Sequence, residues 1–466
     1  MKLPNLKPAV RRQLNLRPLL KYGSLLTALA FFAGNADAQL LYWDANGSTA
    51  GSGSAPAGTW GSNAYWNTDS TGGAGTFSTA TTSSNDLYFS AGPSATSGNA
   101  VYAVTVSGTQ SANSLNFQSS ATGPNNANAG TTLNGGTINL GAGGITAPQY
   151  AYGTTPRGNV RINSAIALQA SSTFFSDNVN AIRALWVMGN ISDGAGSYGI
   201  TKTGAGELHI GGNNSFDGGV TLDTGRLVLR GSANAAGTGT LTINGGSLSI
   251  DNTITLANNQ QTWAGDFTVQ TYGGTQNVGN GTVTLTGNRA VNVDASQNFI
   301  VGGTITDLGN AYNLTKNGTG TMTLGGINAY TGNTTVNAGT LVLSDNANLI
   351  FDIASSGVNN QINGTGTLTL DGDFSFDLSG AGTGLGDSWN IVTVGTLTES
   401  FGATFMVQDF TEVISGIWER DFGGTIYQFD KSTGILSVTG VIPEPSSFLL
   451  LTTGLATVLL RRRRQS

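Results

Sequence analysis

Short stretches of alternating apolar and polar side chains recur throughout residues 39–440. In TMTL (321–324), Met322 and Leu324 point to one side of an extended chain, and the two threonines point to the other. This period of two is typical of a strand with one buried face. TTVNAGTLVL (334–343) holds two such strands separated by Asn-Ala-Gly. Because Gly, Asn and Asp separate strands of only a few residues, the pattern predicts a coil that turns often.

The body of the chain also repeats. Residues 189–229 align without a gap with residues 303–343 at an offset of 114, and 17 of the 41 paired positions are identical. A self-match at a fixed period is the signature of a solenoid or another repeat array. Residues 133–136 recur more loosely as 243–246, at an offset of 110. We therefore predict a unit of about 110 residues that contains several smaller rungs.

These patterns predict an all-β protein: a right-handed parallel β-helix, with an N-terminal signal helix and a short apolar C-terminal helix. A string of β-sandwiches is the alternative. The composition agrees, because the chain has 69 glycines and a body rich in Asn and Thr, all of which are poor helix formers. The expected parts are a signal peptide (1–38), an N-terminal β cap region (39–130), the β-helix (131–345), a C-terminal β region (346–440) and a sorting segment (441–466).

The N-terminus has the features of a secretory signal. A basic lead reaches Lys21, an apolar stretch covers 25–32, and Ala36-Asp37-Ala38 forms an A-x-A cleavage site. We expect the export machinery to carry the chain and signal peptidase to cut after Ala38, with Ala36 and Ala38 as the small residues that the peptidase reads. The pair Arg11-Arg12 leaves a twin-arginine signal as an alternative.

The C-terminus has three parts in a fixed order. A rigid Pro443-Glu444-Pro445 element precedes the uncharged, leucine-rich run 446–460. A block of arginines follows and should stay on the cytoplasmic side of a membrane. We expect transient insertion into the inner membrane through 446–460, stopped by Arg461, Arg462, Arg463 and Arg464. An ordinary tail anchor is the alternative.

This C-terminal order resembles the PEP-CTERM sorting signal of Gram-negative bacteria. The resemblance covers about 25 residues and implies recognition and cleavage by an exosortase, a membrane-embedded cysteine transpeptidase. By analogy, Pro443, Glu444 and Pro445 form the recognition element. The resemblance further implies delivery of the mature protein to the cell surface or the extracellular matrix.

The repeats resemble the autotransporter-associated β-strand repeat. The second copy follows that pattern from Leu314 to Leu341, with Met322 in place of a leucine. The first copy departs more, since Phe216 stands for Tyr and Arg226 for Thr. The resemblance implies an extended β-helical stalk of a secreted surface protein. The end RRRRQS does not match the membrane barrel of a true autotransporter.

Trp43, Trp60 and Trp66 lie among glycines at the start of the body. We expect them to form a cap, because exposed ends of a β-helix must be covered. A carbohydrate-binding platform is the alternative, since indole rings stack well on sugars. Further along, 416–440 predicts a closing hairpin.

The charge of the body argues against nucleic acid. Positions 39–440 hold 10 basic and 24 acidic residues, a net charge of about −14, whereas nucleic-acid binding needs clustered Lys and Arg. The chain has no cysteine and a single histidine, so neither a thiolate metal site nor a Ser-His-Asp triad is expected. We expect His209 to be a solvated surface residue and predict no cofactor.

Two groups of acids are weaker candidates for chemistry. Asp371, Asp373 and Asp377 fit the wet face of a strand better than a calcium loop. Asp217 and Asp223 could serve a polysaccharide lyase or hydrolase, but Thr331 and Asn337 replace them in the second copy. The leading expectation is thus an exported, non-enzymatic structural or adhesive surface protein associated with exopolysaccharide. A carbohydrate-binding protein and, less favoured, a polysaccharide-degrading enzyme are the alternatives.

Overall fold

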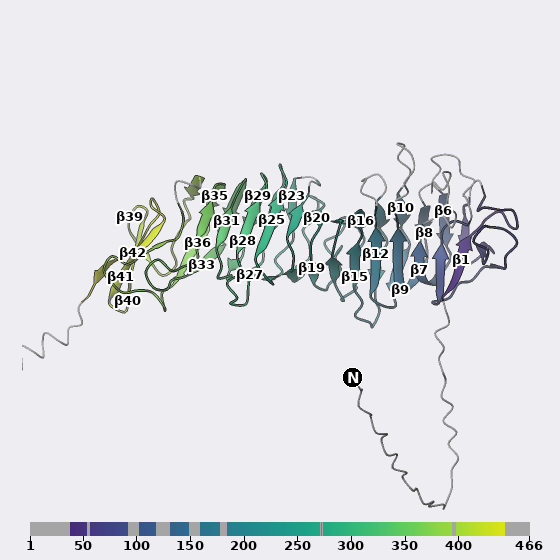
Figure 1. The fold of residues 1–466 in the computed structure, drawn as a ribbon, viewed down its shortest axis with the longest axis horizontal. Helices are drawn as coiled ribbons and strands as arrows, with labels where there is room; N and C mark the ends of the chain where they lie inside the picture. The colour runs from purple at the N-terminus through teal and green to yellow at the C-terminus, as the bar shows by residue number, and fades with distance from the viewer. Residues whose placement is uncertain are drawn as a thin grey trace, which may run out of the picture. The chain divides into compact units, whose positions relative to one another are not determined.

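The computed structural model describes residues 38–442, apart from 54–55, 92–101, 118–130, 149–158, 178–183, 271, 273 and 394–397. The described residues contain strands and no helix, and the strands stack in successive turns of a parallel β-solenoid (Figure 1). The predicted all-β parallel solenoid is confirmed, and the β-sandwich alternative is wrong. The expected terminal helices, together with Ala36 and 443–466, lie outside the described residues.

The strands form four sheets along the solenoid and one at its C-terminal end. The longest has 15 strands: β1 (Gln39–Trp43), β3 (Trp66–Asn67), β4 (Phe77–Ser78), β5 (Asn85–Tyr88), β7 (Thr109–Asn116), β9 (Thr137–Ala147), β11 (Ala165–Leu168), β12 (Ser172–Ser176), β14 (Ile191–Ser192), β15 (Ile200–Thr203), β17 (Val220–Leu222), β19 (Leu241–Ile243), β21 (Gln261–Trp263), β24 (Val283–Leu285) and β27 (Ile305–Thr306).

A second sheet has 13 strands: β2 (Gly58–Trp60), β6 (Tyr102–Val106), β8 (Thr131–Asn134), β10 (Val160–Ile162), β13 (Leu185–Val187), β16 (Glu207–Ile210), β18 (Arg226–Leu229), β20 (Ser247–Ile250), β22 (Phe267–Val269), β25 (Arg289–Val293), β28 (Leu314–Asn317), β31 (Thr334–Val336) and β34 (Ile362–Gly364). A third holds β23 (Thr275–Asn277), β26 (Asn298–Val301), β29 (Thr321–Leu324), β32 (Thr340–Leu343), β35 (Thr367–Leu370) and β38 (Thr398–Phe401). A fourth holds β30 (Ile327–Asn328), β33 (Asn348–Asp352) and β36 (Asp373–Asp377).

The pairing register shows how the chain winds. Along the first sheet, Val220 pairs in parallel with Leu241, Leu241 with Gln261, Gln261 with Val283 and Val283 with Ile305. In this part of the first sheet one turn therefore takes 20 to 22 residues, which is the rung inside the longer unit seen in the sequence. Because each strand pairs with the strand one turn later, side chains of the same kind stack along the solenoid.

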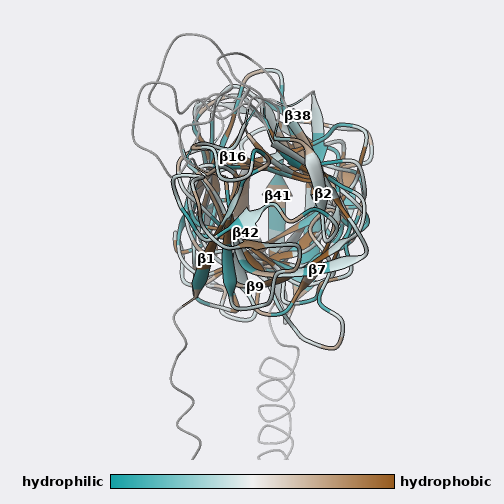
Figure 2. Ribbon diagram, turned by 90° about the vertical axis from the view of Figure 1, so that its right-hand side faces the viewer, coloured by the Kyte–Doolittle hydropathy of each residue, from teal (hydrophilic) through white to brown (hydrophobic). Residues whose placement is uncertain are grey.

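The interior is filled by the apolar half of each alternation. Leu208, Leu227 and Leu248 occupy equivalent positions on three successive turns, and all three are fully buried. Figure 2, viewed along the stack, shows the strands arranged around a common centre, which these side chains fill. The TMTL alternation (321–324) is confirmed, since Met322 and Leu324 are buried while the threonines are half-exposed.

Buried polar side chains close the corners of the coil, and the same ones recur in both repeats. Lys202 and Lys316, 114 residues apart, are fully buried, and each Nζ donates to three backbone carbonyls at 2.7–3.1 Å. Burial lowers the pKa of each lysine from 10.5 to about 8. Asn214 and Asn328 form the same bridge in the two copies, each accepting a backbone N–H and donating to two carbonyls. These invariant polar residues are therefore structural.

The tryptophans at the start of the body lie inside it. Trp43, Trp60 and Trp66 are fully buried, and Trp66 lies edge-on to the other two at 5.0 and 5.4 Å between ring centres. The indole N–H of Trp43 donates to the Pro56 carbonyl at 2.7 Å. No face of these rings is left for a sugar, so the carbohydrate platform proposed for them is wrong.

An antiparallel sheet follows the last turns. It contains β37 (Ser388–Asn390), β39 (Thr411–Ile414), β40 (Ile417–Phe422), β41 (Thr425–Asp430) and β42 (Ile435–Val441). The hairpin predicted over 416–440 is confirmed by the pairing of β40 with β41, and β42 extends it. Phe429 contacts Phe374 of β36 at 5.9 Å between ring centres, so this sheet packs on the end of the coil.

Candidate binding surface on the first repeat

The most distinctive surface lies on the outward side of β13, β16, β18, β20 and β22. In β16 the alternation buries Leu208 and Ile210 in the core and turns Glu207 and His209 outward. Parallel pairing then places Glu207 beside Arg226 and His209 beside Trp186. Neighbouring rungs of a sheet are about 4.8 Å apart, so these side chains meet directly.

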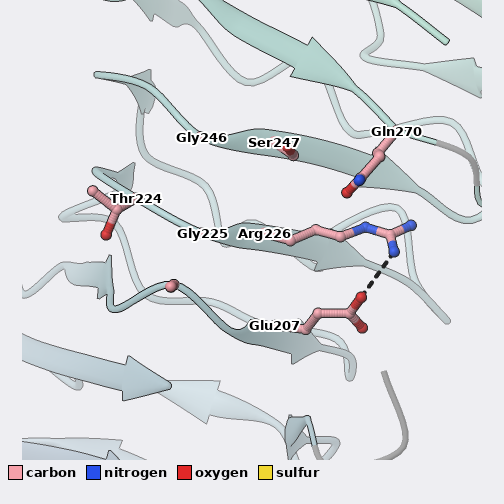
Figure 3. A pocket seen from close by; sticks show the side chains of 8 residues that line it. Glu207, Thr224, Gly225, Arg226, Gly246, Ser247 and Gln270 are labelled. Atoms are coloured by element: carbon pink, nitrogen blue, oxygen red, sulfur yellow. Dashed lines mark hydrogen bonds and ion pairs between the residues drawn. The ribbon is translucent and has the colours of Figure 1, made fainter. Parts of the chain in front are cut away.

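Glu207 joins the charged groups of this surface. Its Oε1 accepts a hydrogen bond from Arg226 Nη1 at 2.9 Å (Figure 3). Its Oε2 lies 3.0 Å from His209 Nε2. The hydrogen bond with His209 and the charge of Arg226 lower the pKa of Glu207 from its ordinary value. Burial lowers the pKa of His209 below 6.5, despite the nearby carboxylate. At neutral pH an uncharged His209 therefore donates Nε2–H to an ionised Glu207.

Aromatic rings and arginines surround this pair. The Trp186 ring stacks on His209, with ring centres 4.1 Å apart and an angle of 6° between the planes. The guanidinium groups of Arg161 and Arg230 each lie 4.8 Å from the centre of the Trp186 ring. Arg230 also donates to the Tyr272 hydroxyl at 2.6 Å. The cluster is thus a cationic and aromatic patch built across adjacent rungs. We call it the arginine–tryptophan patch; its members are Arg161, Trp186, Glu207, His209, Arg226, Arg230 and Tyr272.

A shallow groove borders the patch. It has a volume of about 590 Å³ and is lined by Glu207, Arg226, Ser247, Gln270 and the backbone corners at 224–225. Figure 3 shows Glu207, Arg226 and Ser247 on the successive strands β16, β18 and β20, with Gln270 just beyond the end of β22. Its lining mixes charged and amide side chains with glycine and alanine, so it can contact both the hydroxyls and the apolar faces of a sugar-like ligand.

His209 was missed as a member of this cluster. The sequence placed it correctly on the outward side of its strand but predicted a solvated residue, and that prediction is wrong: His209 is 2% exposed. The cause is long-range, because Trp186 and Tyr272 cover it from other turns. The signal that could have found the cluster is the departure of Glu207, His209 and Arg226 from the threonines of the second repeat.

The acidic candidates do not gather into a catalytic or metal-binding group. Asp217 is exposed, whereas Asp223 accepts from Asn244 on the next turn at 2.7 Å. The solvent-facing side of a strand expected for these aspartates is confirmed for Asp373 and Asp377, which alternate with two buried phenylalanines in β36. In the described part of the chain, no three His, Cys, Asp or Glu side chains are grouped as metal ligands would be.

The structure does not describe the sorting residues predicted from the sequence. Pro443, Glu444, Pro445 and Arg461–Arg464 lie outside the described residues, whereas Ala38 is the first described residue and β1 begins at Gln39. Within the ranges that the structure describes, no helix has the length and apolar character needed to cross a bilayer.

Comparison with protein-family models identifies both the repeat and the C-terminal segment. The model described as the Passenger-associated-transport-repeat matches residues 200–229, 222–250 and 314–343. The PEP-CTERM protein-sorting motif matches residues 441–464. The chain carries both elements, as the sequence resemblance predicted. The match at 222–250 is a copy that the sequence alignment missed, because it begins one rung after the first copy.

A search of characterised proteins adds one informative relative. The chain is 30% identical over 257 residues to the Adhesin BmaC autotransporter of Brucella suis biovar 1 (strain 1330). The match covers 49% of this chain but only 7% of that adhesin. With the family matches, it supports an exported, cell-surface β-solenoid protein.

Proposed function

We propose that this protein is a non-enzymatic, structural and adhesive β-solenoid of the bacterial surface, associated with exopolysaccharide. The observation that carries the proposal is the joining, in one chain, of a passenger-type solenoid and a C-terminal sorting motif. Each turn of such a solenoid adds about 4.8 Å to a stiff body, which suits a spacer that presents an extended side to partners.

The proposed route to the surface uses both ends. The export machinery takes the chain across the inner membrane, and signal peptidase cuts after Ala38. The run 446–460 holds the chain in the inner membrane until an exosortase reads Pro443-Glu444-Pro445, with Arg461–Arg464 on the cytoplasmic side. Cleavage then releases the acidic body to the cell surface or matrix, without a role for nucleic acid.

Replacement of Pro443, Glu444 and Pro445 by alanine tests the sorting step. We expect the variant to remain in the inner-membrane fraction at unprocessed length, while a Lys431→Ala control is processed normally. Fractionation and mass spectrometry of the C-terminus measure this outcome. Normal processing of the triple variant would show that another element directs sorting.

A pull-down of the host's exopolysaccharide tests the role of the body. We expect wild-type protein to retain the polymer and leave its chain length unchanged, because the described residues hold no cluster of His, Cys, Asp or Glu that could bind a catalytic metal. Shortening of the polymer would establish an enzyme and overturn the structural proposal. Failure to retain it would remove the exopolysaccharide association.

A further inference from the structure

We propose that the arginine–tryptophan patch binds an acidic sugar, a hydroxylated ring that carries a carboxylate. This inference deepens the proposed function, on which it rests, by naming the class of glycan and the place where it binds. It starts from an uneven distribution of charge. In a body with a net charge of about −14, Arg161 of β10, Arg226 of β18 and Arg230, which directly follows β18, come together on the outward side of the four adjacent strands β10, β13, β16 and β18.

The second repeat shows that folding does not require this patch. In the first copy Trp186 pairs with His209, and Glu207 pairs with Arg226. At the matching registers of the second copy, Ile300 pairs with Thr323, and Thr321 pairs with Thr340. Both copies build the same buried corners, so a charged and aromatic set on one copy alone needs an explanation other than the fold.

Among the described residues, two buried polar atoms of the patch have no hydrogen-bond partner. They are the Nε1 of Trp186 and the Nδ1 of His209. Since His209 donates through Nε2 to Glu207, its Nδ1 carries a lone pair and can only accept. The indole N–H of Trp186 can only donate. A buried polar atom without a hydrogen bond is unfavourable, so a ligand that satisfies both atoms gains affinity.

These requirements define the ligand. It must present an acceptor to Trp186, a donor to His209 and a negative charge to Arg161, for which the described residues supply no carboxylate partner. Inorganic phosphate supplies charge, acceptors and an O–H donor, but it has no further unit that could extend into the groove beside Arg226; a neutral sugar supplies hydroxyls but no charge. A sugar carboxylate offers all three, and arginine pairs with carboxylates in a bidentate geometry.

We expect a ligand to reach the patch through side-chain movement. The arginines that lie over Trp186 are long, flexible and partly exposed, so a change of rotamer can bring a guanidinium to the ligand and uncover the indole N–H. The groove of about 590 Å³ beside Arg226 continues toward Ser247 and Gln270 and gives room for further sugar units of the same chain.

Binding of polygalacturonate to the processed full chain tests the proposal, with dextran as a neutral glycan and inorganic phosphate as a simple anion. We expect wild-type protein to bind polygalacturonate in preference to both. The Arg161→Gln/Arg230→Gln variant should bind at least about tenfold more weakly, because charged hydrogen bonds are lost. The Arg289→Gln/Arg420→Gln control, with the same change of net charge elsewhere, should stay within about twofold.

A second variant separates binding from folding. Trp186→Ile installs the residue that the second repeat carries at this register, so the solenoid should fold with an unchanged circular dichroism spectrum and lose polygalacturonate binding. Equal binding of phosphate, or equal weakening in the control, would reduce the effect to general electrostatics and overturn the proposal.

The two levels of inference can fail separately. If wild-type protein retains the host's exopolysaccharide but the Arg161→Gln/Arg230→Gln variant still binds polygalacturonate normally, this site is wrong and the proposed function stands. If the variant loses polygalacturonate binding but wild-type protein never retains the host's polymer, the site stands and the exopolysaccharide association is wrong.

Discussion

Lys316 offers a direct test of how the repeat is held together. Its Nζ, fully buried, donates to the carbonyls of Asn317, Gly318 and Ala338 at 2.8–3.0 Å. Lys316→Met keeps the length of the side chain but leaves these three carbonyls without that donor. Each unpaired buried carbonyl costs about 1–3 kcal/mol, so we take the three together as about 6 kcal/mol.

Removal of the buried charge offsets part of this loss. A pKa of about 8 in place of 10.5 corresponds to about 3 kcal/mol of unfavourable burial of the ammonium group. The balance is a decrease of about 3 kcal/mol in the free energy of unfolding at neutral pH. Urea denaturation followed by circular dichroism measures it. Lys431→Met, which removes a half-exposed lysine, should change the same quantity by less than about 1 kcal/mol.

The pH dependence gives a sharper version of the test. Below about pH 8, Lys316 is protonated in both the folded and the unfolded chain, so it adds no pH dependence. Between pH 8 and 10.5 the unfolded chain holds a proton that the folded chain has lost, and the free energy of unfolding therefore rises with pH. The rise reaches about 2 kcal/mol per lysine near pH 9.5. Lys316→Met should lose one such increment and keep that of Lys202. Equal slopes in the two proteins would show that the three carbonyls hold Nζ as an ammonium ion, which refutes the reasoning from burial.

Three further outcomes follow from the same contacts. Trp66→Ala should lower the free energy of unfolding by about 3–5 kcal/mol in urea denaturation, without weakening sugar binding, because the ring is fully buried; weakened binding in a folded variant would restore the platform. Asn328→Ala should cost about 2–3 kcal/mol, against less than about 1 kcal/mol for the exposed Asn337→Ala, and equal costs would contradict the corner role. The pKa values of His209 and Glu207 in the folded protein lie below their ordinary values. The free energy of unfolding therefore decreases as the pH falls below about 6.5, where His209 of the unfolded chain takes up a proton, and again below about 4.5, where Glu207 does. His209→Gln should therefore flatten the upper part of this loss in a thermal-unfolding series, and an unchanged profile would exclude the histidine as its cause.

The sequence predicts the solenoid well because the determinants of a rung are local. The alternation in 321–324 and the Asn-Ala-Gly break at 337–339 correspond to β29, β31 and β32 as the structure has them. The rung length of 20 to 22 residues was harder to read, since overlapping copies such as 200–229 and 222–250 share their ends. Only the pairing register separates them.

The candidate site depends on contacts between turns, which no local pattern reveals. His209 stands alone in the sequence as a polar residue on a strand face, and its burial follows from Trp186, 23 residues earlier, and Tyr272, 63 residues later. The guanidinium group of Arg161 lies over the Trp186 ring and comes from yet another turn. In a parallel solenoid, residues about one rung apart become neighbours. A cluster of polar residues therefore becomes visible only when the sequence is aligned on itself with the period of one rung.

The comparison between repeat copies therefore separates structure from function more clearly than residue type does. Buried lysine is unusual, yet Lys202 and Lys316 recur with the same three carbonyl partners and belong to the frame. Arginine on a sheet surface is ordinary, yet Arg226 replaces the threonine that serves the same register in the second copy. The fold alone requires the buried lysine positions. It does not require arginine at position 226, because threonine completes the rung equally well at that register. A cluster of such replacements on adjacent turns is therefore where we expect this solenoid to bind a partner.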